Sequence, residues 1–235
     1  MCGRYTLIRL ADVLEKFPWI EHAPPDLVPR YNIAPTQPLL AIANDHPNEF
    51  THFYWGLVPS WAKDISVGHK MINARAETLP EKPSYRTALR RRRCLILADG
   101  FYEWQVDPAT AHKSRPKKQP MWIRMKDHKP FAFAGLWEHW HDHQGAGNEL
   151  RSCTVITTSP NELMRPIHDR MPAIVPPELY KDWLSKDERE PDELMAMLGP
   201  YPADQMEATP VSTFVNSPKN EGPGCVEGMT KGTLW

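Results

Sequence analysis

The sequence predicts an α+β fold built on antiparallel or mixed β-sheets. Short stretches rich in β-branched and aromatic residues alternate with a few stretches at helical spacing along the 235 residues. The 25 prolines interrupt regular elements often and favour short strands, turns and long ordered loops over a helical bundle. Hydrophobic residues make up 41% of the chain, which is enough for a sizeable core, and no linker divides it. One large domain is therefore expected.

The first expected element is a helix over residues 10–17, where Leu10, Val13, Leu14 and Phe17 recur at helical spacing. A Pro-rich connection follows from residue 24 to residue 38. Strands are then expected at residues 39–43, 49–55, 93–98, 121–125, 131–136 and 151–157. Further helices are expected at residues 84–91, 161–165, 177–184 and 192–198, the second of them capped by Ser159 or Asn161. The chain from Asn216 onward is expected to be mostly irregular.

Composition excludes several classes of protein. The net charge of −1 excludes a globally basic nucleic-acid binder, although basic residues gather at 86–93 and 113–118, and the second cluster is expected to be a loop. No apolar run approaches the ~20 residues that span a bilayer, and the N-terminus lacks the pattern of a secretory signal. The four cysteines are far apart, so a disulfide framework is not expected. A reducing, cytoplasmic compartment fits these features.

The residue after the initiator Met1 is a cysteine, and its small side chain favours removal of Met1. The mature chain would then begin at Cys2 with a free amine and a thiol on the same residue. The amine of such a 1,2-aminothiol condenses with an aldehyde, and the thiol closes onto the imine to give a thiazolidine. The amine, with a pKa of about 8, is also able to take the thiol proton and make Cys2 a nucleophile.

Three further segments carry polar side chains in contexts that suggest a site, at residues 73–78, 98–104 and 166–172. Asn73 lies among dense hydrogen-bonding groups. Glu103 follows an apolar strand and sits among aromatic residues, where desolvation would keep its proton to a higher pH. His168 lies between apolar residues and prolines, and its ordinary pKa of about 6.5 suits proton transfer. Together with Cys2 these side chains make a complete set for covalent catalysis.

Structural roles compete with each of these assignments. Asn73 is able to cap a turn, Glu103 to pair with an arginine, and His168 to be a hydrogen-bonded core histidine. Two other patterns have the same ambiguity. Alternating histidines at residues 139–143 are able to bind Zn²⁺ or Ni²⁺ but look like the solvent-open shoulder of a hairpin. Trp55 and Trp61 suit either stacking on unpaired bases or burial in the core.

Eight motifs in order resemble the SOS-response-associated peptidase (SRAP) family. They are MCGRY at residues 1–5, RYNIAPT at 30–36, WGLVPSW at 55–61, NARAET at 73–78, DGFYEW at 99–104, TT at 157–158, HDRMP at 168–172 and VNSP at 215–218. Each is weak alone, but their order from residue 2 to about residue 218 makes the resemblance specific.

The resemblance implies a single α+β domain with a barrel-like, mainly antiparallel β core, flanking helices and long ordered loops. The expected domain covers residues 1–226, with a short tail at 227–235. The implied catalytic residues are Cys2 as the crosslinking residue, Asn73 to orient its amine or the sugar, and Glu103 and His168 as proton carriers, with His168 protonated during ring opening. The residues implied to contact DNA are Arg4, Pro35, Trp55, Trp61, Arg75, Arg86 and Thr158. No cofactor and no metal are expected.

The resemblance also implies a function, which is to sense abasic sites in single-stranded DNA and to form a covalent thiazolidine DNA–protein crosslink through Cys2. Such a protein would shield the lesion during the DNA damage response. It is expected to be a monomer and to have no membrane partner. One alternative is a cysteine peptidase or amidohydrolase of the N-terminal-nucleophile type, with release of its own Met1 as its most limited activity. Another is a non-catalytic module that binds single-stranded DNA.

Overall fold

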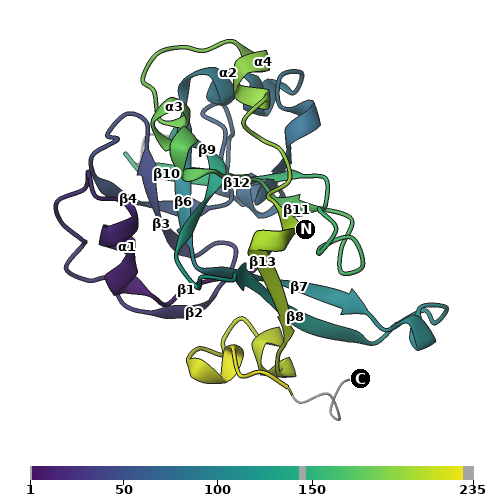
Figure 1. Ribbon diagram of the computed structural model, residues 1–235. Coiled ribbons are helices and arrows are strands. Elements are labelled where there is room, and N and C mark those ends of the chain that lie inside the picture. Colours follow the sequence, from purple (N-terminus) through teal and green to yellow (C-terminus); the bar gives the residue numbers. More distant parts are fainter. Residues whose placement is uncertain (1, 143–146, 230–235) are drawn as a thin grey trace.

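A five-stranded barrel forms the centre of the molecule (Figure 1). The computed structural model describes residues 2–142 and 147–229. The barrel strands are β3 (Pro38–Ala43), β4 (Phe50–Trp55), β6 (Arg93–Ala98), β9 (Phe131–His141) and β10 (Glu149–Thr158). Four of their pairings are antiparallel, and a parallel pairing of β10 with β4 closes the ring. The expected barrel-like, mainly antiparallel core is therefore confirmed, with one parallel seam.

Three short strands extend the barrel sheet at residues that matter for the site. β5 (Asn73–Arg75) pairs in parallel with β10, β11 (Met171–Pro172) pairs antiparallel with the end of β10, and β12 (Ile174–Val175) pairs antiparallel with β9. The carboxyl-terminal half of β10 thus has β5 beside it, and its last two residues also pair with β11.

A second, antiparallel sheet packs against the barrel. Its strand order is β13 (Met206–Pro210), β8 (Lys118–Met125), β7 (Gly100–Val106), β1 (Tyr5–Leu7) and β2 (Arg30–Ile33). Tyr5 lies edge-on to Trp55 and Phe133 at ring-centroid distances of 5.4 and 5.8 Å, and Phe101 lies 6.0 Å from Phe133. These buried aromatic contacts join the two sheets and hold the start of the chain in place.

Helices lie around the sheets (Figure 1). The α-helices are α1 (Leu10–Lys16), α2 (Pro83–Arg91), α3 (Tyr180–Trp183) and α4 (Pro191–Met195). Short 3-10 helices span Ile65–Lys70, Ala76–Thr78, Pro108–Thr110, Pro177–Leu179, Ala203–Gln205, Thr213–Asn216 and Pro223–Cys225. Within residues 2–142 and 147–229, none of the helices has the length and apolar character needed to cross a bilayer.

The structure corrects three local expectations. Residues 161–165 form consecutive turns rather than a helix, although Asn161 does accept a hydrogen bond from the Met164 amide in the manner of a cap. The Pro-rich connection contains strand β2, because residues 30–33 gain a partner in β1. Residues 100–106 were expected only as a segment that follows the strand at 93–98, and they form a strand of their own, β7.

Residues 227–229, which were expected to belong to a short tail, contact the second sheet and the residues that follow it. Ser212 donates its amide to the Glu227 carbonyl, Gly228 forms a β-bridge with Val211, and the Met229 amide donates to Pro210. The described chain therefore remains attached to the second sheet through residue 229, and residues 230–235 lie outside the described residues.

Candidate functional site

The register of two strands places Cys2 beside Glu103. β1 and β7 are antiparallel, with Tyr5 opposite Phe101, and the Tyr102 amide donates to the Arg4 carbonyl at 3.0 Å. Because the two strands are antiparallel, the residues that precede Arg4 lie beside Glu103. The Cys2 side chain is fully buried, and its thiol lies 3.9 Å from the Arg4 carbonyl oxygen. Met1 lies outside the described residues.

Asn73 reaches Cys2 from the other side of the site. β5 holds Asn73 opposite Val155 of β10, and its Nδ2 donates to the Cys2 carbonyl oxygen at 2.8 Å. Its Oδ1 is buried and has no hydrogen-bond partner among the described residues. Because a buried acceptor without a donor is costly, this oxygen favours a ligand or an amine that donates to it. The predicted proximity of Cys2 and Asn73 is present.

Glu103 and His168 form the acid–base part of the site. The Glu103 Oε2 and the His168 Nε2 are 4.0 Å apart, and the side chain of Glu103 is 3% exposed while that of His168 is 26% exposed. Burial raises the pKa of Glu103 to about 7, and the nearby Asp169 carboxylate adds to the rise. Burial also lowers the pKa of His168 from its ordinary value. Near neutral pH Glu103 is therefore able both to hold and to release a proton, and the lowered pKa of His168 favours its neutral form over the expected protonated one.

The backbone selects one tautomer of His168. The Arg170 amide donates to Nδ1 at 3.0 Å, so Nδ1 is an acceptor and the proton of the neutral ring belongs on Nε2, which faces Glu103. The Asp169 carboxylate also lies 2.9 Å from Nδ1. We assign the bond to the amide, because Asp169 is 85% exposed and water competes for its carboxylate. An open hollow of about 750 Å³ borders His168 and gives it access to solvent.

The thiol of Cys2 is neutral in this arrangement. Burial raises the pKa of Cys2, and the charge of Glu103 raises it further. A thiolate is therefore not the resting form of this side chain. The chemistry that remains is addition of the thiol to an electrophile while a neighbouring base takes its proton.

An ion pair ties the segment of Asn73 to that of His168. Arg170 donates two hydrogen bonds to the Glu77 carboxylate, at 2.8 and 2.9 Å, and a third to the Thr157 carbonyl at 2.6 Å. Glu77 lies in the 3-10 helix that directly follows β5, so the pair connects both segments to β10. Glu77 and Arg170 belong to the motifs at residues 73–78 and 168–172, but the sequence did not predict that they pair with each other.

The residues implied to contact DNA fall into different environments. Trp61 is 63% exposed, whereas Trp55 is fully buried and donates its indole N–H to the Ile72 carbonyl at 2.9 Å. The implied role of Trp55 in stacking on DNA is therefore corrected to a core role, because its ring has no free face. Of the arginines implied to contact DNA, Arg75 on β5 and Arg86 on α2 are exposed. Arg86 lies in a separate pocket that is also lined by Arg90, Arg91 and Glu188. Pro35 is half-buried and Thr158 is buried.

Arg4 has structural partners that the sequence did not reveal. Its Nη1 donates to the Asn32 side chain and to the Val215 carbonyl, both at 2.8 Å, and its Nη2 donates to the Asn216 carbonyl at 3.2 Å. Only Nε and one Nη2 hydrogen remain for a phosphate. Asn32 itself donates to the carbonyls of residues 217 and 220, so it anchors the carboxyl-terminal segment under the site. Asn32, Val215 and Asn216 all stand in the motifs at residues 30–36 and 215–218, but the sequence did not show that these two motifs contact each other through Arg4.

The chain is similar to known proteins along nearly its whole length. A family model described as SOS response associated peptidase (SRAP) matches residues 1–218. The chain is 50% identical over 231 residues to the abasic site processing protein YoqW of Bacillus subtilis (strain 168), covering 97% of this chain and 99% of that protein. It is 29% identical over 239 residues to the abasic site processing protein YedK of Escherichia coli (strain K12), covering 97% and 99% of the two chains. Cys2, Asn73, Glu103 and His168 all lie within the matched range.

A solved structure shows the same fold. The crystal structure of a protein from Bacteroides thetaiotaomicron superposes with a TM-score of 0.84 at 26% sequence identity, covering 97% of this chain and 100% of that one. The barrel and its second sheet are thus shared by proteins whose sequences differ at most positions.

Proposed function

Because the chain belongs to the SOS response associated peptidase (SRAP) family, we propose that it captures abasic sites in single-stranded DNA. After removal of Met1, Cys2 forms a thiazolidine with the sugar and so shields the lesion. The observation that carries the proposal is the convergence of four side chains from distant segments on the start of the chain. Asn73 holds the Cys2 backbone, and Glu103 and His168 stand beside it.

The covalent steps balance without a cofactor. The ring-opened abasic sugar carries an aldehyde at C1′. The Cys2 amine adds to that carbon, and loss of one water gives a Schiff base. The Cys2 sulfur then adds to the same carbon and its proton passes to the nitrogen, which closes the five-membered ring. One water is released for each crosslink, and nothing is oxidised or reduced.

The proton carriers match these steps. The Glu103 carboxyl, with a pKa of about 7, supplies the proton that the departing hydroxyl group needs. His168 is neutral near this pH and accepts a proton in the sugar-opening or thiol-addition step. The Asn73 Oδ1, which has no partner among the described residues, accepts a hydrogen bond from the amine of processed Cys2. This bond directs the lone pair of the amine nitrogen at C1′. Exposed Trp61 and Arg75 supply stacking and phosphate contacts without reading base edges.

A crosslinking assay tests the proposal. Protein whose loss of Met1 is verified by intact mass is mixed with a single-stranded oligonucleotide that carries one abasic site. Wild-type protein is expected to give a 1:1 adduct that survives denaturing electrophoresis, and Cys2→Ala is expected to give none. Cys225→Ala is the matched control, since Cys225 is another buried thiol outside the site, and it should crosslink like wild type.

Three outcomes overturn the proposal. Denaturation-resistant adduct in equal amount from Cys2→Ala and wild type means that Cys2 does not form the bond to the lesion. DNA binding by both proteins without any such adduct leaves a non-catalytic DNA-binding module. Turnover of a small amide or peptide by Cys2, without DNA capture, identifies a hydrolase of the N-terminal-nucleophile type instead.

A further inference from the structure

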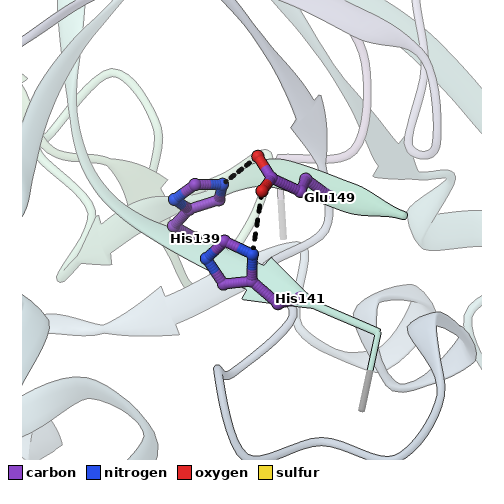
Figure 2. Close-up of side chains that lie close together, drawn as sticks. All are labelled: His139, His141 and Glu149. Atoms are coloured by element: carbon purple, nitrogen blue, oxygen red, sulfur yellow. Dashed lines mark hydrogen bonds and ion pairs between the residues drawn. The ribbon is translucent and has the colours of Figure 1, made fainter. Parts of the chain in front are cut away.

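Two histidines and a glutamate converge on one face of the β9–β10 hairpin (Figure 2). Nε2 of His139 lies 3.2 Å from one carboxylate oxygen of Glu149, and Nδ1 of His141 lies 3.1 Å from the other. The two imidazole rings are 4.1 Å apart at their centroids. None of these three side chains takes part in the site around Cys2.

The register of the hairpin explains the convergence. His141 is directly opposite Glu149, and His139 is opposite Arg151. Residues that alternate along a strand point to the same face, and directly opposed residues of an antiparallel pair share that face. His139, His141 and Glu149 are therefore presented together by backbone pairing.

The three side chains provide the ligand set and the spacing of a divalent transition metal. Two imidazole nitrogens and one carboxylate oxygen are a common set for zinc, and imidazole also suits copper and nickel. Bonds of 2.0–2.1 Å in a tetrahedral arrangement place ligand atoms about 3.3 Å apart. The two N···O separations already lie near this value, and the candidate ligand atoms are all within 4.8 Å of one another. All three side chains are at least partly exposed, so their rotation allows the three ligand atoms to converge on one ion.

The nearest opposed cation is engaged elsewhere. Arg151 donates to the Asp45 carboxylate at 2.7 Å, and its guanidinium stacks over Phe53 and Trp137 at 4.9 and 4.7 Å. These contacts hold its charge away from the carboxylate of Glu149. The side chains of His139, His141 and Glu149 are 39%, 53% and 60% exposed, so a hydrated ion reaches them without any opening of the fold.

We propose that His139, His141 and Glu149 form a binding site for a divalent transition-metal ion of the zinc class, with water completing the coordination. The ion joins the ends of β9 and β10 where the hairpin leaves the barrel. Glu149 and Val155, the partner of Asn73, are six positions apart on β10, which corresponds to about 20 Å along a strand. The metal site is therefore separate from the proposed crosslinking site and does not depend on it.

Calorimetric titration of Zn²⁺ tests the proposal on the full chain carrying Cys2→Ala, which removes the one thiol of the crosslinking site. We expect one saturable equivalent with a Kd tighter than about 100 μM, the tight limit of the weakest class of calcium sites in proteins. Substitution of both His139 and His141 by alanine should weaken binding at least tenfold, and Glu149→Gln should weaken it to a smaller degree. The matched control is His22→Ala, because His22 is exposed and also lies beside a glutamate, Glu21, at 4.0 Å.

Binding of Cu²⁺ to the same proteins provides a direct readout of the ligands. Electron paramagnetic resonance should show hyperfine coupling to two nitrogens in the parent protein and in His22→Ala, and lose it in the double variant. Far-UV circular dichroism and the melting temperature without metal show whether the variants are folded. Equal Zn²⁺ affinity in the parent and the folded double variant, or no saturable binding below about 100 μM, overturns the proposal.

Discussion

Burial controls the proton of Glu103 more than any charged neighbour does. The carboxyl lies on β7, between the start of the chain and His168, and its pKa rises to about 7 mainly because water is excluded. The same exclusion lowers the pKa of His168 and raises that of Cys2. One physical cause thus shifts the carboxyl, the imidazole and the thiol toward their neutral forms.

The raised pKa of Glu103 predicts a pH-dependent stability. Below its ordinary pKa of 4.5 the carboxyl is protonated in both the folded and the unfolded chain. Between 4.5 and about 7 only the unfolded chain releases the proton, so the free energy of unfolding falls as pH rises. At about 1.4 kcal/mol per pH unit the loss is at most about 3–4 kcal/mol.

Urea denaturation of wild type and Glu103→Gln between pH 5 and pH 8 measures this loss. The wild-type stability should decrease more steeply with pH than that of Glu103→Gln, which has no such proton to release. Comparing each protein with itself removes any constant effect of the substitution. Parallel pH profiles for the two proteins would show that Glu103 titrates normally.

At the scale of elements, β10 assembles the site. Its residues Val155 and Thr157 pair with β5, and Thr157 and Thr158 pair with β11. β5 carries Asn73, and β11 directly follows the segment of His168. A short stretch of one strand therefore sets the distance between two functional groups that are almost 100 positions apart in the sequence.

The pair of Glu77 and Arg170 is expected to act as a positioning device for this assembly. Glu77→Gln removes the bidentate ion pair but leaves the bond from Arg170 to the Thr157 carbonyl. Glu77 is half-exposed, so the free energy of unfolding should change by less than about 1 kcal/mol. The rate of crosslinking at saturating DNA should fall by up to about 100-fold, because His168 loses its fixed orientation.

A matched variant separates positioning from charge. Glu15→Gln removes an exposed carboxylate that pairs with Lys129 at 3.3 Å on another part of the surface, and it should crosslink at the wild-type rate. A wild-type rate in Glu77→Gln as well would remove the positioning role from this ion pair.

At the scale of the whole molecule, barrel closure depends on a residue without a side chain. Gly135 on β9 lies opposite both Cys94 of β6 and Val155 of β10. A Cβ atom at this position would lie 2.7 Å from the Cys94 Sγ and 2.7 Å from the Ile96 Cδ1. The barrel interior is filled to the point that one methyl group has no room there.

Gly135→Ala should therefore reduce the free energy of unfolding by about 1–3 kcal/mol, the usual effect of overpacking a core. Gly199→Ala is the control, since a Cβ at Gly199 would meet nothing within 4 Å, and its effect should be near zero. Urea denaturation measures both. Equal stability of the two variants would mean that the barrel relaxes around the added methyl group.

Local patterns in the sequence predicted the five barrel strands and the four α-helices, but none of the short strands β1, β2, β5, β11 and β12. Helix α1 and the barrel strands lie where helical spacing and β-branched or aromatic runs indicated them. Residues 30–33 and 161–165 did not follow local patterns. The first became a strand because β1 supplies its hydrogen bonds, and the second stayed a series of turns although a cap was present. A pairing partner far away in the chain decided the first case.

The sequence by itself determined the fold class, the family and the identity of the four residues proposed for chemistry, because these depend on residue types in a recognisable order. The tertiary structure decided how those residues behave. It buried Trp55 and exposed Trp61 within a single motif, engaged Arg4 with Asn32, and placed His139 and His141 against Glu149. Solvent exposure, pKa and pairing are properties of the surroundings that distant segments create, and no local stretch of sequence contains them.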